Sequence, residues 1–157
     1  MKNAINLVLL LALLMTVALN LSACNGADPT DIAKAYCEGI TTANFNLLNE
    51  CCHPSVYMEM RDGMLLAYQE SYPPSQYGYK FSITEIGECT SLQLSNLEHS
   101  YRKDLNIDVS MEAGYLYKYI WTAYDDEGSA SESVDIICVA KVGAHWYAFP
   151  TPSGFYE

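Results

Sequence analysis

A row of aromatic residues is the clearest candidate in this sequence for binding a flat ligand. Tyr115, Tyr117, Tyr119 and Trp121 recur at every second position, and alternate residues of a strand point to the same face. Such a row could stack against a sugar ring or another flat apolar group, and with Trp146 it makes up the predicted pocket. The alternatives are that the row packs beneath helices, because aromatic side chains bury large apolar areas wherever they lie, or that it forms a dimer surface.

The cysteines are the most reactive side chains. Cys24 ends an apolar leader, and five more follow it: Cys37, Cys51, Cys52, Cys89 and Cys138. An odd number leaves at least one thiol unpaired or bridging to another molecule. A disulfide from Cys37 to Cys51 or Cys52 would join two early helices, and one from Cys89 to Cys138 would join two strands. The alternative is that the thiols stay reduced and pack as small apolar residues.

Two further clusters are poor metal sites. Cys51-Cys52-His53 with Cys37 holds adjacent cysteines, whereas zinc ligands are normally spaced a few residues apart. Asp125-Asp126-Glu127-Gly128 lacks the alternating ligand spacing of the known calcium loop, and a charged hairpin turn explains it. The chain also has no glycine loop for a phosphate. We therefore predict neither a metal nor a cofactor.

The N-terminal residues have the form of a secretory leader. Lys2 precedes an apolar run from Ile5 to Leu21, and small residues follow it, as in a signal peptide. The segment Leu21-Ser22-Ala23-Cys24 resembles the lipobox of bacterial lipoproteins. That resemblance implies removal of residues 1–23, acylation of Cys24 and a lipid-anchored position on the extracytoplasmic face of the cell membrane. The alternative is an uncleaved transmembrane helix, which would also place the domain outside the cytoplasm.

The charge of the chain limits its partners. The formal net charge is −11, and loss of Lys2 with the leader would make it −12. Such an acidic surface opposes binding to nucleic-acid phosphates, which relies on Lys and Arg. It should also be repelled by anionic lipid head groups. We therefore predict a lipid-anchored tether at 24–28, followed by a single acidic domain at 29–157. The predicted partner is the lipid bilayer, which the chain would contact through Cys24, and we do not expect the chain to bind nucleic acid.

Helices are predicted first along the chain. Asp28 as N-cap and Pro29 at the first helical position begin a helix, in which Ile32, Tyr36 and Ile40 mark one buried face. The other predicted elements are a short helix around 47–52, an interrupted helix over 55–71, a loop at 72–76, a strand at 79–84, a helix at 95–106 that begins at a capping box formed by Ser95 and Glu98, and strands at about 113–124, 131–142 and 145–149. This order predicts an α+β fold with an antiparallel sheet.

The last hairpin allows a prediction of register. A two-residue loop at Gly143-Ala144 pairs Val142 with His145, Ala140 with Tyr147 and Cys138 with Phe149. Both faces of the hairpin then carry apolar residues, which a sheet with one solvated side would not need. We therefore expect a helix, a ligand or another subunit to cover the second side.

The layout resembles the nuclear transport factor two-like superfamily, and within it uncharacterised small lipoproteins of Gram-positive bacteria. The features that carry this resemblance are the first helix, the short second helix after Ala43-Asn44-Phe45, the proline at 54 and the final hairpin with His145-Trp146-Tyr147. It covers most of residues 29–150. It implies N-terminal helices packed on a curved antiparallel sheet, a pocket on the concave side and a convex side that often dimerises.

Enzymes of that superfamily place acidic, tyrosine or histidine side chains inside the cone for proton transfer. The candidates by this resemblance are Asp135, Tyr117, Tyr119, His99 and His145. A desolvated carboxyl at Asp135 would have a raised pKa and could act as a general base, but its neighbours Glu132 and Ser133 indicate a solvated strand end. No catalytic motif is visible, so we do not expect an enzyme.

The sequence thus predicts a membrane-anchored extracytoplasmic domain that binds a small ligand or a peptide. The alternative is a structural or protein-interaction module of an envelope complex, either as a homodimer or with an envelope protein. An isomerase or dehydratase is the third hypothesis.

Overall fold

The computed structural model describes residues 27–65, 78–124, 127–128, 130–152 and 155. Their elements, in chain order, are α2 (Pro29–Thr42), α3 (Phe45–Cys51), α4 (Pro54–Met60), a π-helical turn η1 (Arg61–Leu65), β1 (Gly78–Glu88), α6 (Ser91–Leu105), β2 (Ala113–Tyr124), β3 (Ala130–Val142) and β4 (His145–Pro150). The predicted leader with Cys24, the end of the helix predicted over 55–71 and the loop predicted at 72–76 lie outside the described residues.

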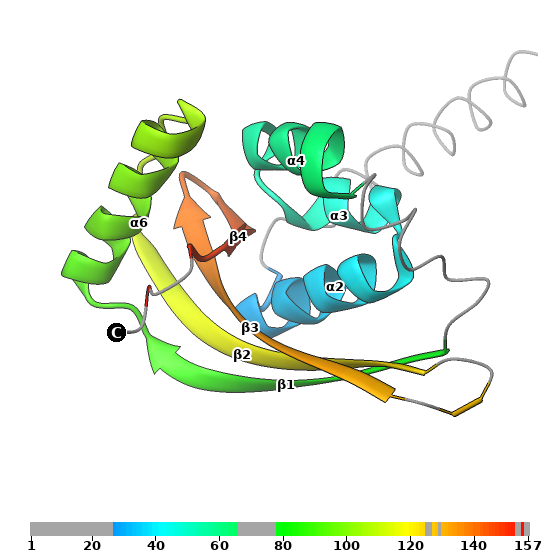
Figure 1. The fold of residues 1–157 in the computed structure, drawn as a ribbon. Helices are drawn as coiled ribbons and strands as arrows, with labels where there is room; N and C mark the ends of the chain where they lie inside the picture. The colour runs from blue at the N-terminus through cyan, green and yellow to red at the C-terminus, as the bar shows by residue number, and fades with distance from the viewer. Residues whose placement is uncertain (1–26, 66–77, 125–126, 129, 153–154, 156–157) are drawn as a thin grey trace, which may run out of the picture.

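The strands form one antiparallel sheet in the order β1-β2-β3-β4. The sheet is strongly curved, and helices from the N-terminal part of the chain lie on its concave side (Figure 1). The predicted α+β class is therefore confirmed. The predicted register of the last hairpin is also confirmed, since Val142 pairs with His145 and Cys138 with Phe149.

Helix α2 begins as predicted. The Asp28 carboxylate accepts a hydrogen bond from the Thr30 backbone N–H at 2.8 Å, and Pro29 follows it. The helix ends at Thr42, and the left-handed φ of 50° at the C-cap Ala43 turns the chain so that the Asn44 N–H donates to the Gly39 carbonyl at 2.9 Å. The predicted face with Ile32, Tyr36 and Ile40 is buried, and it packs against the sheet.

The start of α6 corrects the prediction made for residues 95–106. The capping box is formed by Thr90 and Gln93, five residues before the predicted Ser95 and Glu98. Ser95 lies exposed inside the helix, and the Glu98 carboxylate instead accepts a hydrogen bond from the Met111 N–H at 2.6 Å. Both four-residue patterns fit a helix start, and the helix begins at the earlier one because β1 ends at Glu88, two residues before Thr90.

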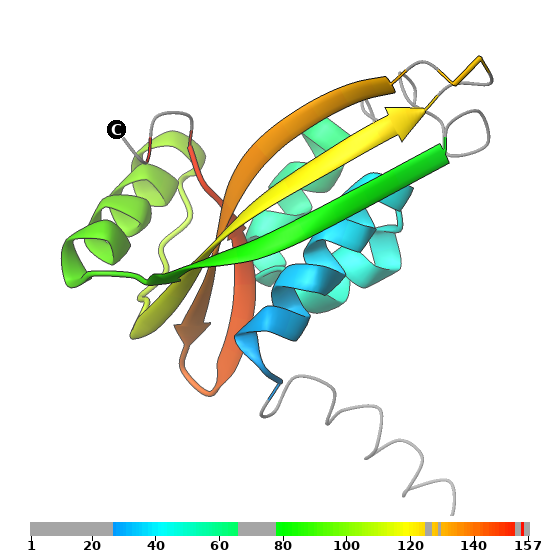
Figure 2. The same cartoon turned by 90° about the horizontal axis from the view of Figure 1, so that it is seen from below.

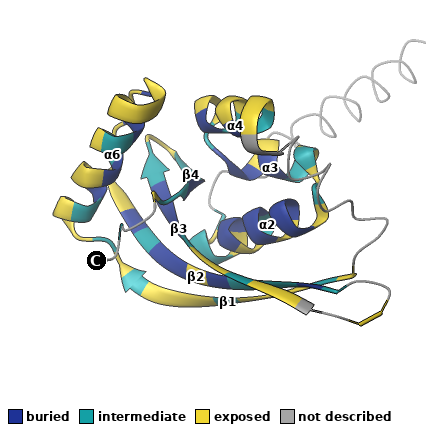
Figure 3. Cartoon of the chain, viewed as in Figure 1, coloured by how far each residue is buried: buried dark blue, intermediate teal, exposed yellow. Residues whose placement is uncertain are grey.

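The two faces of the sheet are covered by different helices. The inner face, which carries Tyr117 and Tyr119, packs on α2; the outer face is covered at one end by α6 (Figures 1 and 2). Further along the outer face Val134 is 51% exposed, and yellow segments extend over β1 and β3 in Figure 3. The expected cover of the second side is therefore α6, and it is partial.

The α3–α4 junction closes the sheet edge at β4. Cys52 forms a parallel bridge to Ala148, and the following His53 ring stacks on Phe149 with centroids 6.0 Å apart. From the other side, the Tyr101 ring of α6 meets Phe149 edge-on at 5.5 Å. Phe149 therefore lies between the two helical parts of the molecule. In the part of the chain that the structure describes, no helix has the length and apolar character needed to cross a bilayer.

Candidate ligand groove

A groove of about 340 Å³ lies between α4 and α6, with the end of β4 and the residues after it as its floor. We call it the α4–α6 groove. Its lining residues are Val56, Glu59, Met60, Ser100, Tyr101, Asp104, Leu105, Pro150, Thr151 and Pro152.

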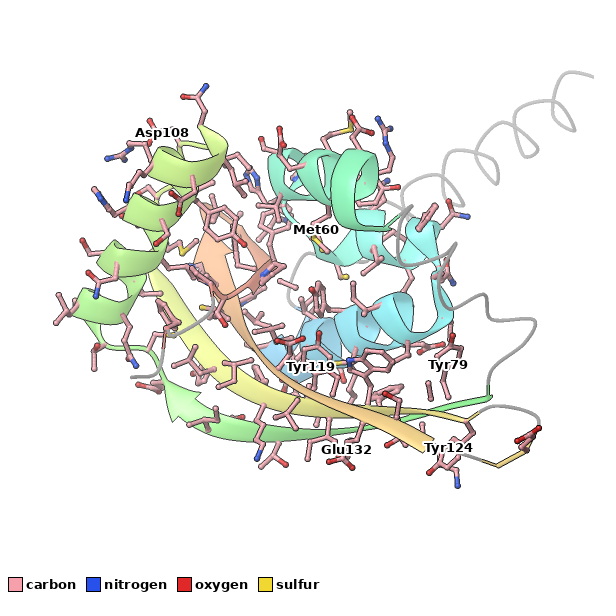
Figure 4. The ribbon with its side chains drawn as sticks, in the orientation of Figure 1. Met60, Tyr79, Asp108, Tyr119, Tyr124 and Glu132 are labelled. Atoms are coloured by element: carbon pink, nitrogen blue, oxygen red, sulfur yellow. The ribbon has the colours of Figure 1, made fainter. Side chains whose placement is uncertain are left out.

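The apolar walls come from pairs spaced by one helical turn. Val56 and Met60 are four residues apart on α4, and Tyr101 and Leu105 are four apart on α6, so each pair lies on one face of its helix. Figure 4 shows Met60 beneath α4, on the inner side of the helix. Val56, Met60 and Tyr101 are buried, whereas Leu105 is 41% exposed. The walls therefore offer an apolar surface that is open to solvent on the α6 side.

The floor of the groove is held by hydrogen bonds. The Tyr101 hydroxyl donates to the Pro150 carbonyl at 2.7 Å, and the Thr151 hydroxyl donates to the Ile136 carbonyl at 2.7 Å. Burial raises the pKa of Tyr101 above its ordinary value, so the phenol keeps its proton and remains a donor. These two bonds fix the chain after β4 against α6 and the sheet, and the groove is therefore pre-formed.

The charged residues of the lining are both acidic. Glu59 comes from the α4 wall and Asp104 from the α6 wall. The arginines nearest to them in sequence bind neighbouring aspartates, with Arg61 at 2.7 Å from Asp62 and Arg102 at 2.6 Å from Asp108. Each wall of the groove therefore contributes one carboxylate beside its apolar surface.

The predicted aromatic pocket lies elsewhere in the molecule. The row shares one face of β2, as its spacing predicts, and that face packs on α2: Tyr119 meets Tyr36 edge-on at 6.1 Å, and the Tyr117 hydroxyl lies 3.3 Å from the Thr30 hydroxyl. Figure 4 shows Tyr119 between the sheet and α2.

The other members of that predicted pocket are less buried. Tyr115 and Trp146 form a tilted ring pair with centroids 5.8 Å apart, and both are half-buried, as is Trp121. None of the predicted aromatic residues lines the α4–α6 groove.

The candidates for proton transfer are brought together in one place only. The Tyr119 hydroxyl donates to the Asp135 carboxylate at 3.3 Å. Partial burial raises the pKa of Asp135, and this hydrogen bond partly opposes the rise. His99 is exposed on α6, and His145 contacts Tyr147 at the hairpin end of β4. None of these residues lines the groove.

The five described cysteines are thiols and fall into two regions. Cys37, Cys51 and Cys52 are buried in the helical part; burial, with the adjacent Cys51, raises the pKa of Cys37 to about 12. The Cys89 and Cys138 sulfurs lie 3.5 Å apart. Within the described ranges, no group of three or more His, Cys, Asp or Glu side chains is placed to hold a metal ion.

Sequence reasoning missed the groove because its walls lie far apart in the chain. The four-residue spacing of Val56 with Met60, and of Tyr101 with Leu105, is visible in the sequence and marks an apolar face on each helix. That these two faces meet across Phe149 depends on the sheet between them, which spacing does not reveal.

Neither the protein-family models nor the curated proteins gave a match to this chain.

Proposed function

We propose that this protein is a lipid-anchored extracytoplasmic lipoprotein whose domain binds an apolar, positively charged peptide segment in the α4–α6 groove. The observation that carries the proposal is the groove itself: apolar walls, a floor fixed by hydrogen bonds and an acidic rim. Position in the cell follows from the resemblance of Leu21-Ser22-Ala23-Cys24 to a lipobox, and the ligand class follows from the lining.

The size of the groove favours a short segment. Small-molecule sites span about 300–1,000 Å³, so about 340 Å³ is at the lower end of that range. This volume holds one or two apolar side chains. A peptide that places two such side chains between basic residues would fill the walls and bring its charges to the rim.

The charges support a cationic partner. Glu59 and Asp104 come from opposite walls of the groove, and the whole chain carries a net charge of −11. An acidic surface steers positively charged partners toward it and repels negatively charged ones. The same charge disfavours an anionic ligand in a groove of this kind.

The fold is compatible with a nuclear transport factor two-like cone. The support is the sheet that curves around α2, with the short helices α3 and α4 after it (Figure 1). In this chain the proposed ligand site lies beside α6, at the end of the sheet, and the concave surface itself is filled by α2 and the aromatic row.

Two blocked tetrapeptides with a shared Leu-Leu centre test the proposal, one flanked by lysines and the other by glutamates. Calorimetric titration of the full chain in mild detergent should show binding of the lysine peptide alone. Asp104→Asn should weaken binding about two- to fivefold, as expected for one exposed ion pair.

Leu105→Asn and Leu92→Asn form a matched pair of variants, since asparagine removes the apolar contact without adding charge to the rim. Both leucines lie on α6 and are exposed, at 41% and 70%, but only Leu105 lines the groove. Leu105→Asn should weaken binding by about tenfold, and Leu92→Asn should leave it unchanged. Equal binding of both peptides, or equal loss in both variants, would refute the proposed ligand site.

An interaction module is the second candidate, and the uncovered part of the outer face favours it. Val134 is 51% exposed and pairs with the half-buried Ile120, next to Ile136. If this patch joins two copies of the chain, Val134→Asp should convert a dimer into a monomer in light scattering. A monomer at all concentrations before the substitution would exclude the homodimer.

A further inference from the structure

Two cysteines that are distant in sequence meet above one glycine. Cys89 follows β1, and its N–H donates to the Gly114 carbonyl at 2.8 Å. Cys138 lies on β3, opposite Leu116 of β2. The two sulfurs are 3.5 Å apart, and they lie 3.1 and 3.2 Å from the position that a Cβ on residue 114 would occupy. The absence of a side chain at Gly114 is what lets the sulfurs approach each other across β2.

The two thiols differ in environment. Cys138 is fully buried, whereas Cys89 is partly exposed. Cys89 also directly precedes Thr90, the N-cap of the 15-residue helix α6, and the N-terminus of a helix favours a thiolate. A hydrogen bond from the Cys138 thiol lowers the pKa of Cys89, and the same contact and burial raise the pKa of Cys138. Cys89 is therefore the accessible nucleophile and Cys138 the protected thiol beside it.

We propose that Cys89 and Cys138 form a thiol–disulfide exchange site, in which Cys89 reacts with an external disulfide and Cys138 resolves the product. A low-pKa, accessible cysteine next to a second cysteine is the arrangement that reacts reversibly in this way. The site is separate from the α4–α6 groove and does not depend on the peptide proposed to bind there.

The reaction balances with a disulfide as oxidant. The Cys89 thiolate attacks one sulfur of the external disulfide, forms a mixed disulfide and releases a thiolate, which takes a proton from solvent. The Cys138 thiol then loses its proton and attacks the Cys89 sulfur. The mixed disulfide breaks, and the second external thiolate leaves and is protonated. Two protein thiols are oxidised, and one external disulfide is reduced to two thiols.

The product would join the end of β1 to β3 across β2. Because Cys89 stands next to the first residues of α6, the disulfide would fix that end of the helix to the sheet. The exchange site would thus hold α6 in place over the outer face.

Oxidised glutathione is the probe for the test. The full chain, reduced and purified in mild detergent, is incubated with it, and the products are digested and mapped by mass spectrometry. The proposal predicts loss of two hydrogen atoms from the chain and recovery of a linked Cys89–Cys138 peptide. In Cys138→Ala the reaction should stop at the mixed disulfide, with one glutathione bound to Cys89. In Cys89→Ala, Cys138 should not bind glutathione and no link should form.

Cys37→Ala is the matched control. Cys37 is buried and its pKa is raised, so this variant should form the Cys89–Cys138 link as the unaltered chain does. Far-UV circular dichroism checks that each variant is folded. The mass-spectrometric map of the unaltered chain tests the proposal even if a variant does not fold. Separate, unlinked Cys89 and Cys138 after oxidation of the unaltered chain would overturn the proposal, as would capture of glutathione on Cys51 or Cys52 in place of Cys89.

Discussion

Gly114 shows how one missing side chain determines the packing of the outer face. A Cβ at this position would lie 2.9 Å from the Leu94 Cδ2 and close to the sulfurs of Cys89 and Cys138. Atoms at such distances must move apart, and α6 covers the sheet at this point. The glycine therefore matters for the position of α6 as well as for the meeting of the two thiols.

We predict that Gly114→Ala lowers the free energy of unfolding by about 1–3 kcal/mol, the usual cost of overpacking a core. Urea denaturation measures it. Gly78→Ala is the control, because among the described residues a Cβ there would have only the Tyr124 Cβ near it, at 4.0 Å. A Gly114→Ala variant as stable as Gly78→Ala would show that α6 is not seated on the sheet as described.

His53 is the residue at which acidity should affect stability. Its Nδ1 is buried and has no hydrogen-bond partner, the ring contacts Tyr147 and Phe149, and burial lowers its pKa below the ordinary 6.5. The unfolded chain therefore takes up a proton at a higher pH than the folded one. The free energy of unfolding that the neutral His53 ring contributes is fully present above pH 6.5, and it is lost as the pH falls toward the lowered pKa of the folded state.

We predict that thermal unfolding of the chain shifts to lower temperature between pH 7.5 and pH 5, and that His53→Gln makes this shift smaller. His99→Gln replaces an exposed histidine and should leave the shift as it is. An identical pH dependence in the unaltered chain and in His53→Gln would contradict this role of His53.

At the level of elements, local rules predicted α2 and the strands well. The N-cap Asp28 with Pro29 is a signal contained in neighbouring residues, and the two-residue turn at Gly143-Ala144 determines the register of β3 with β4. Strand β1 continues to Glu88, four residues beyond the strand predicted at 79–84. The start of α6 was predicted wrongly because Thr90 with Gln93 and Ser95 with Glu98 are both acceptable capping boxes. The choice between them depends on where β1 ends.

The two candidate capping boxes can be compared directly by one alanine substitution in each. Thr90→Ala removes the hydroxyl that accepts the Gln93 N–H and should destabilise the protein by about 1 kcal/mol. Ser95→Ala replaces an exposed residue inside the helix and should change stability little, since alanine favours helix. Chemical denaturation measures the free energy of unfolding of both variants. A larger loss for Ser95→Ala than for Thr90→Ala would show that Thr90 is not the N-cap of α6.

For the whole molecule, the sequence indicated the class of fold but not the place of the groove. The apolar faces of α4 and α6 are local properties, whereas the meeting of the two helices depends on the sheet, whose Phe149 touches His53 before α4 and Tyr101 on α6. The aromatic row illustrates the same limit. Its shared face follows from alternation, but only the position of α2 decides that Tyr117 and Tyr119 are buried against a helix.

The anchor is a prediction about the intact protein. Cys24→Ser should abolish incorporation of a labelled fatty acid and removal of residues 1–23, because the sulfur is the acylated atom in the lipoproteins that the leader resembles. Mass spectrometry of the protein isolated from its native membrane measures both. A bare Cys24 thiol with the leader still attached would refute the assignment.

The most direct test of the α4–α6 groove is a titration of the lysine-flanked peptide into the full chain with isotope-labelled methionine methyl groups, followed by nuclear magnetic resonance. Met60 lines the groove, while Met111 is buried and does not line it, so each reports on a different part of the core. We predict a saturable shift of the Met60 methyl signal and an unchanged Met111 signal. Binding that moves Met111 and leaves Met60 unchanged would contradict it.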